Sequence, residues 1–203
     1  MLNNPAIAST PLRTKYGNQT LFVFSWSENE QDNLLALVPE AKSASPLVRV
    51  QSACYTGEIF GSLDCDCHWQ LETSLRMIQK EGGAFIYMLK DGRGAGLLSK
   101  IRGMKLTNEI GMDTAEAYIH MGISPDPRNY EQARFALRYL KFSRIRLLTN
   151  NPRKVAALQK YGFEVRRVPI ESQPTENNRD YLFAKATKLG HMMRSFGTDE
   201  GQE

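Results

Sequence analysis

The chain has 203 residues, of which 41% are hydrophobic and 24% are charged. These proportions match an average globular protein and exclude an intrinsically disordered chain, and the length suits one domain with its own core. No apolar run approaches the ~20 residues that a membrane-spanning helix needs. Residues 1–17 contain no apolar core of a secretory leader, so we expect a cytoplasmic protein without membrane partners.

Basic residues outnumber acidic ones by 26 to 22, which gives a net charge of +4. Three of the acids lie in residues 197–203, so the rest of the chain is more basic still. This excess fits an anionic partner such as a nucleotide, a nucleic acid or a phosphorylated metabolite, and it fits solubility alone equally well. The basic residues are too scattered for a nucleic-acid-binding arm, and we expect no nucleic-acid partner.

The first half of the chain is predicted to be rich in strands. Apolar and β-branched runs between polar turns predict strands at residues 20–26, 34–38 and 47–53. Helical spacing of leucine and isoleucine predicts a helix at 69–80, which ends at Gly82-Gly83. A short apolar run at 84–89 predicts a buried strand.

The second half is predicted to alternate between helices and strands. We expect helices at 97–109, 130–140, 153–161 and 180–193, and strands at 145–148 and 163–168. Together the elements predict an α+β (mixed α/β) fold in a single domain over residues 1–196. The acidic tail, residues 197–203, is predicted to be disordered.

The only cysteines are Cys54, Cys65 and Cys67, and an odd number argues against a framework of disulfides alone. If residues 65–67 are extended, both sulfurs point to one side, and Cys54 can return from a neighbouring strand or turn. Three thiolates suit zinc with a fourth position open, as in catalytic sites. The alternative is three unrelated buried thiols. His68 would face away from this cluster on a continuing strand, and His120 and His191 are predicted to be ordinary polar residues in helical segments.

Two loops have the composition of phosphate-binding turns. The glycine-rich stretch at 91–96 follows a predicted strand and precedes a predicted helix, although a plain turn explains it as well. Thr149, Asn150 and Lys154 surround the start of another helix, where an ordinary N-cap is the alternative. Asp126 and Arg128 lie two residues apart in a proline-bounded loop, either as an oriented charge pair or as a solvated turn.

The ordered motifs between residues 47 and 192 resemble those of GTP cyclohydrolase II, an enzyme family of riboflavin synthesis. They are RVQSACYTGEIFGSLDCDCHWQLE, DGRGAGLLSKIR, GMDTAEA, DPR, LLTNNPRK and ENNRDYL. The resemblance implies a catalytic zinc that activates water for attack on C8 of the guanine of GTP. Ring opening then releases formate, pyrophosphate leaves from the triphosphate, and a diaminopyrimidine ribosylamino 5′-phosphate remains. The resemblance also implies Mg²⁺ with the triphosphate and a homodimer.

Matching the motifs residue by residue assigns roles in this sequence. Cys54, Cys65 and Cys67 match the zinc ligands. Asp126 matches the proton acceptor, and Arg128 matches a nucleophile towards the α-phosphate, for which a phosphate clamp is the alternative role. The nucleotide contacts match Arg49, Val50, Gln51, Ser52, Ala53, Gln70, Asp91, Gly92, Arg93, Thr114, Thr149 and Lys154.

The sequence departs from the family pattern at five positions. Gln51 replaces a histidine, Ala53 and Asp91 replace glutamates, Met104 replaces a catalytic tyrosine, and Met112 replaces a bulkier residue. A thioether cannot donate the proton that a phenol can. The alternatives to neutral drift are therefore a paralogue that stops at the formylated pyrimidine, or one that acts on another purine nucleotide. A nucleic-acid-binding module with structural zinc is a third possibility, but it needs a fourth ligand.

Overall fold

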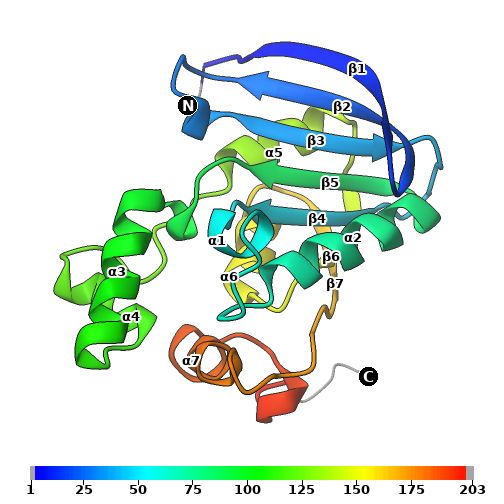
Figure 1. Ribbon diagram of the computed structural model, residues 1–203. Helices are drawn as coiled ribbons and strands as arrows, with labels where there is room; N and C mark the ends of the chain where they lie inside the picture. The colour runs from blue at the N-terminus through cyan, green and yellow to red at the C-terminus, as the bar shows by residue number, and fades with distance from the viewer. Residues whose placement is uncertain (1–2, 200–203) are drawn as a thin grey trace.

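A computed structural model describes residues 3–199, and a seven-stranded mixed sheet forms its centre (Figure 1). In chain order the strands are β1 (Ala6–Thr14), β2 (Gly17–Ser25), β3 (Leu34–Pro39), β4 (Leu47–Ser52), β5 (Gly83–Met88), β6 (Arg144–Leu148) and β7 (Glu164–Val168). Their spatial order is β1-β2-β3-β5-β4-β6-β7. Neighbours from β1 to β5 pair antiparallel, whereas β5, β4, β6 and β7 pair parallel. The sheet therefore has an antiparallel half and a parallel half.

Helices cover both faces of the parallel half. Alternate residues of β4 point to opposite faces, so Val48 and Val50 pack with α5 (Glu131–Tyr139) and α6 (Pro152–Lys160). Leu47 packs on the other face with Leu75 and Ile78 of α2 (Cys67–Glu81). The result is a three-layer arrangement, which is the usual environment of parallel strands (Figure 1).

Four further helices lie outside these layers, where the parallel strands end. They are α1 (Tyr55–Glu58), α3 (Leu97–Ile110), α4 (Thr114–His120) and α7 (Arg179–Leu189). Three 3₁₀ turns complete the described elements, at Glu30–Asp32, Gly92–Gly94 and Arg194–Phe196. Figure 1 shows α3 and α4 projecting to one side of the sheet and α7 below it.

The mixed α/β fold class is confirmed, and the predicted elements are found within a few residues of their expected bounds. Three of the described helices and strands escaped prediction: α1, which is a single turn of four residues, β1 and α4. β1 is exposed along eight of its nine residues, so it lacks the alternation of a half-buried strand. α4 is short, although Asp113 and Glu116 form the capping box that marks its start. The last helix ends at Leu189 rather than at residue 193, because Gly190 comes next with a left-handed φ of 66°.

The domain boundary at residue 196 stays a prediction, and residues 200–203 of the tail lie outside the described residues. In the described part of the tail, Asp199 accepts hydrogen bonds of 2.7 and 2.9 Å from Arg167. Within residues 3–199, no helix is long and apolar enough to cross a membrane.

Candidate active site

A cavity of about 400 Å³ opens where β4, β5 and β6 end. Residues just beyond these strands, Ala53, Asp91 and Thr149, all contribute to its lining. The start of α2, the α3–α4 pair and α7 supply its other walls. Ligands of open α/β sheets bind at the carboxyl ends of parallel strands, and this volume is typical of a small-molecule site.

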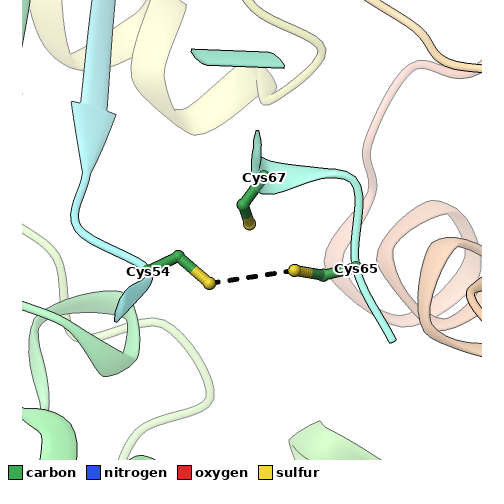
Figure 2. Close-up of side chains that lie close together, drawn as sticks. All are labelled: Cys54, Cys65 and Cys67. Atoms are coloured by element: carbon green, nitrogen blue, oxygen red, sulfur yellow. Dashed lines mark hydrogen bonds between the residues drawn. The ribbon is translucent and has the colours of Figure 1, made fainter. Parts of the chain in front are cut away.

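The three cysteines converge on one wall of the cavity. Cys54 directly precedes α1, Cys65 lies in the loop after α1, and Cys67 is the first residue of α2. The three sulfurs lie within 4.8 Å of one another, and the Sγ atoms of Cys54 and Cys65 are 3.8 Å apart (Figure 2). Their predicted convergence is therefore observed, but the extended geometry predicted for residues 65–67 is wrong, because α2 begins at Cys67.

The sulfur spacing fits a tetrahedral zinc site. Zn–S bonds of about 2.3 Å place two sulfurs about 3.8 Å apart along a tetrahedron edge. A Cβ atom at Gly57 would lie 2.7 Å from the Sγ of Cys65 and 3.4 Å from that of Cys54, so glycine leaves the room that the sulfurs occupy. The candidate ligand group found among residues 3–199 contains these three cysteines and no histidine. His68 instead lies half exposed beside Glu72, on the surface of α2.

Lys100 of α3 connects the cysteines to the glycine-rich loop. Its Nζ donates to the Sγ of Cys54 at 3.1 Å and lies 3.1 Å from Oδ1 of Asp91. Hydrogen bonds from Cys65 and Cys67, together with the charge of Lys100, lower the pKa of Cys54. Burial alone would lower the pKa of Lys100, but Cys54 and Asp91 outweigh it and raise that pKa. The pair therefore favours a thiolate beside an ammonium group.

The glycine-rich loop turns sharply into the cavity. Gly92 and Gly94 have φ values of 61° and 94°, and Arg93 between them adopts φ 55°. A side chain is rarely found in this left-handed region, and such strain clusters at functional sites. Arg93 donates to the backbone oxygen of Pro125 at 3.3 Å, and its guanidinium lies 6.0 Å from the ring centre of Tyr118. The strained turn thus places a cation at the cavity wall.

Asp126 and Arg128 form an oriented ion pair, which settles the choice between a pair and a solvated turn. Two hydrogen bonds of 2.6 Å join the guanidinium to both carboxylate oxygens, and the side chains are 4% and 12% exposed. Burial opposes ionisation of each group, but the pairing outweighs it: the pKa of Asp126 is lowered and that of Arg128 is raised. Arg128 lines the cavity, whereas Asp126 is not one of the lining residues.

Two buried cations face the cavity from the sheet side. Arg49 of β4 is 6% exposed and donates to the backbone oxygen of Leu148 at 2.9 Å. Lys154 of α6 is 4% exposed and donates to the backbone oxygen of Val50. Burial lowers the pKa of Arg49 to about 10, and burial together with Arg49 and Arg128 lowers the pKa of Lys154 well below its usual value. Both groups would be stabilised in their charged forms by an anion.

Most of the predicted site residues share this one cavity. The further ones that line it are Gln51, Ser52, Ala53, Gln70, Gly92, Met104, Thr114 and Thr149. Val50 does not line it, because its side chain is fully buried in the core between β4 and the helices. The arrangement brings together a three-thiol cluster, several basic side chains and the Met104 thioether.

The region that sequence reasoning missed is α7 and the residues just beyond it. Tyr181, Lys185 and His191 all line the cavity. His191 was expected to be an ordinary polar residue within a helix, but it lies beyond the end of α7, and burial together with Lys185 lowers its pKa to about 2. The ENNRDYL motif was the only signal near this wall, and it does not reach Lys185.

Comparisons with known proteins place the chain in a family. A sequence profile of GTP cyclohydrolase II matches residues 5–169. The GTP cyclohydrolase-2 of Hahella chejuensis is 42% identical over 197 residues, covering 96% of this chain and 95% of that protein. The riboflavin biosynthesis protein RibBA of Bacillus cytotoxicus is 42% identical over 185 residues, covering 90% of this chain and 46% of that protein. This chain thus spans about half the length of that second relative.

Among solved structures, RibBX of A. baumannii, a two-domain 3,4-dihydroxy-2-butanone 4-phosphate synthase, aligns with a TM-score of 0.46 and 16% identity. That alignment covers 84% of this chain and 42% of RibBX, and it is too distant to support a statement about this protein. The sequence matches are stronger, because the profile spans most of the chain and the Hahella relative is matched nearly end to end. The chain belongs to the GTP cyclohydrolase II family.

Proposed function

We propose that this protein is a zinc-dependent hydrolase that opens the imidazole ring of GTP at C8 in riboflavin biosynthesis. Formate and pyrophosphate would be released, and a diaminopyrimidine ribosylamino 5′-phosphate would remain. The observation that carries the proposal is a three-thiol cluster set in the wall of a cation-lined cavity. Family membership supplies the identity of the substrate.

Cys54, Cys65 and Cys67 are proposed to hold the zinc ion. When bound by three thiolates with one position open, zinc would lower the pKa of water to about 7 and supply hydroxide at neutral pH. Lys100 supports metal binding by these cysteines, because its ammonium group donates to Cys54 and favours the thiolate form of that side chain. The three-cysteine set does not favour a closed structural site, which would need a fourth protein ligand.

The buried cations are proposed to bind the triphosphate. Arg49, Arg128 and Lys154 surround the inner part of the cavity, and Thr149 lies beside them at the end of β6. Phosphate oxygens would supply the negative charge that stabilises buried Arg49 and Lys154 in their charged forms. Mg²⁺ is proposed to accompany the substrate, with phosphate oxygens and water as its main ligands. The glycine-rich loop with Arg93 and the start of α4 at Thr114 complete the proposed nucleotide contacts.

Arg128 is proposed to act as a phosphate clamp rather than as a nucleophile. Its pairing with Asp126 raises the pKa of the guanidinium, so a neutral and nucleophilic form is strongly disfavoured. Asp126 fixes the plane of the fork through two parallel hydrogen bonds. A planar, charged donor set of this kind matches phosphate geometry.

The homodimer is proposed from family resemblance, whereas the cellular setting and the absence of membrane and nucleic-acid partners are proposed from the composition of the sequence. We propose a cytoplasmic homodimer that uses GTP or a related purine nucleotide and binds neither membranes nor nucleic acid.

Product analysis tests the proposed reaction. Zinc-loaded protein is incubated with GTP and Mg²⁺, the products are identified by mass spectrometry, and formate is measured in parallel. Formate together with the deformylated diaminopyrimidine is the expected result. Unchanged GTP in the presence of bound zinc would overturn the proposal, and parallel incubations with ATP, ITP and GMP would then show whether another purine nucleotide is the substrate.

A second candidate function rests on Met104, which lines the cavity from α3. A thioether at the position of a proton-donating tyrosine could leave ring opening intact but prevent the second hydrolysis, so that a formylated pyrimidine is the product. On this alternative, Met104→Tyr raises formate release, by a factor in the range of about 10²–10⁴ that a general acid contributes. Equal formate release by both proteins would remove the alternative. Met104→Leu serves as the control, because it changes the side chain without adding a donor.

A further inference from the structure

We infer that Lys185 of α7 is a positioning residue for the cysteine cluster, acting through Asp66, which stands between Cys65 and Cys67. This inference rests on the proposed zinc site. It concerns how a helix beyond the profile match at residues 5–169 holds the loop that presents two of the three thiols.

Lys185 and Asp66 form a buried ion pair. The Nζ of Lys185 donates to Oδ1 of Asp66 at 3.0 Å, and the two side chains are 12% and 1% exposed. The ammonium group also lies 4.2 Å from the ring centre of Tyr181, which adds a cation–π contact. Removing one partner of a buried pair leaves the other charge without compensation, so each group constrains the place of the other.

Asp66 is diverted from the role that its position suggests. It is the N-cap residue of α2, where an aspartate normally accepts a hydrogen bond from a backbone N–H of the first turn. Its side chain makes no such bond. Oδ1 faces Lys185, and Oδ2 accepts from Nε2 of Gln70 at 2.6 Å. Lys185 and Gln70 therefore occupy both oxygens of this carboxylate, and we expect these two contacts to hold the backbone between Cys65 and Cys67 in place.

The same carboxylate continues into the anion-binding wall. Gln70, which donates to Asp66, accepts a hydrogen bond from Arg49, and Arg49 in turn donates to Gln51 at 3.0 Å. Nε2 of Gln51 lies 3.4 Å from the backbone oxygen of Cys67. Hydrogen bonds thus connect Lys185 through Asp66 and Gln70 to Arg49 of the cavity wall. Gln51 then links Arg49 to the backbone of Cys67.

Contacts that do not involve Lys185 also hold α7 against the rest of the protein. Leu182, Ala186 and Met193 form a small core cluster of their own, and the backbone N–H of Met192 donates to Asn150 at 2.8 Å. Lys188 pairs with Glu116 of α4 at 2.8 Å. Loss of the Lys185 charge should therefore release Asp66 and the cysteine loop while α7 stays in place.

The test compares Lys185→Met, Lys185→Arg and Lys188→Met with the wild type in two assays. The first measures zinc loss to a competing chelator. Lys185→Met should weaken zinc retention by about 10–100-fold, the usual effect of removing a group that orients a metal ligand. Lys185→Arg keeps the charge and should restore most of the retention. Lys188→Met removes a lysine from the same helix and should retain zinc like the wild type.

The second assay needs no metal. The rate of iodoacetamide alkylation at Cys65 is measured by mass spectrometry in the metal-free protein. It should rise several-fold in Lys185→Met and stay near the wild-type rate in Lys185→Arg and Lys188→Met. If the wild type binds no zinc but alkylation responds as described, the proposed function fails and the positioning role stands. If the wild type binds zinc, equal zinc retention in Lys185→Met and the wild type would overturn the positioning role, and equal alkylation of the two proteins would overturn it in either case.

A further variant covers the case in which Lys185→Met does not fold. The double variant Asp66→Asn/Lys185→Met removes both charges, so no uncompensated charge is buried. It should melt near the wild-type temperature and still lose zinc faster than the wild type. Wild-type zinc retention in the folded double variant would also overturn the inference.

Discussion

The two halves of the sheet differ in the segments to which their strands lead. In the antiparallel half, a two-residue turn joins β1 to β2, residues 26–33 join β2 to β3, and β1 is exposed along most of its length. In the parallel half, β4, β5 and β6 each lead into residues that line the cavity, and the lining residues within 3–199 begin only at Arg49. Parallel strands need crossovers that return to the same edge, so their carboxyl ends gather several loops in one place. One half of the sheet therefore supports the fold, whereas the other half also builds the site.

The largest effect in this comparison is expected beside the cysteines, at Gly57. A methyl group there would lie 2.7 Å from the Sγ of Cys65, so Gly57→Ala should displace the sulfur and weaken zinc binding by about 10-fold or more. Chelator competition measures the change. Gly61→Ala adds a methyl group in the loop that follows α1, where no atom lies within 4 Å of it, at the cost of about 1 kcal/mol of strain at φ +67°. This control should keep its zinc, and equal zinc loss in both variants would contradict the account.

An intermediate effect is expected from Lys154→Met at the cationic wall. Burial lowers the pKa of Lys154 in the folded protein below its ordinary value of 10.5, so the unfolded chain binds more protons between those two pKa values. The free energy of unfolding therefore rises with pH across that window, and the lysine destabilises the fold below it. In urea titrations without ligand, the variant should gain most stability over the wild type at neutral pH, and this advantage should shrink towards pH 10. A difference that does not vary with pH would show that Lys154 is not held at a lowered pKa.

The smallest effect is expected in the antiparallel half. Leu12 of β1 is 37% exposed and far along the chain from any cavity residue. Leu12→Thr keeps a side chain that suits a strand and should change the free energy of unfolding by no more than about 0.5 kcal/mol. Zinc retention and turnover should match the wild type. A loss of turnover in this variant would break the division between the two halves.

The sequence was informative where chemistry is concentrated in short segments. The clustering of Cys54, Cys65 and Cys67 predicted their convergence, because few residues separate them and because thiolates are suitable ligands for zinc. The extended geometry predicted for residues 65–67 was wrong, because the spacing of apolar residues does not show that a helix starts at Cys67 itself. The loop at 91–96 could be placed between a strand and a helix, but its left-handed Arg93 could not be foreseen.

Residues whose roles arise from packing were beyond sequence reasoning. Lys100 and Lys185 resemble ordinary helical lysines, and only the fold brings them to Cys54 and Asp66. Asp126 and Arg128 had two open interpretations, and burial decides between them, because a solvated pair would not hold two bonds of 2.6 Å at 4% and 12% exposure. Long-range contacts of this kind depend on the order of strands in the sheet, which local patterns do not encode.

The most direct test of the central claim is formate release measured as a function of zinc content. Metal-free protein is loaded with increasing amounts of zinc below one equivalent, and each sample is assayed with GTP and Mg²⁺. If the three-cysteine wall of the cavity is the catalytic centre, formate release rises in proportion to bound zinc and saturates at one zinc per chain. Formate release that is independent of zinc content would contradict the account.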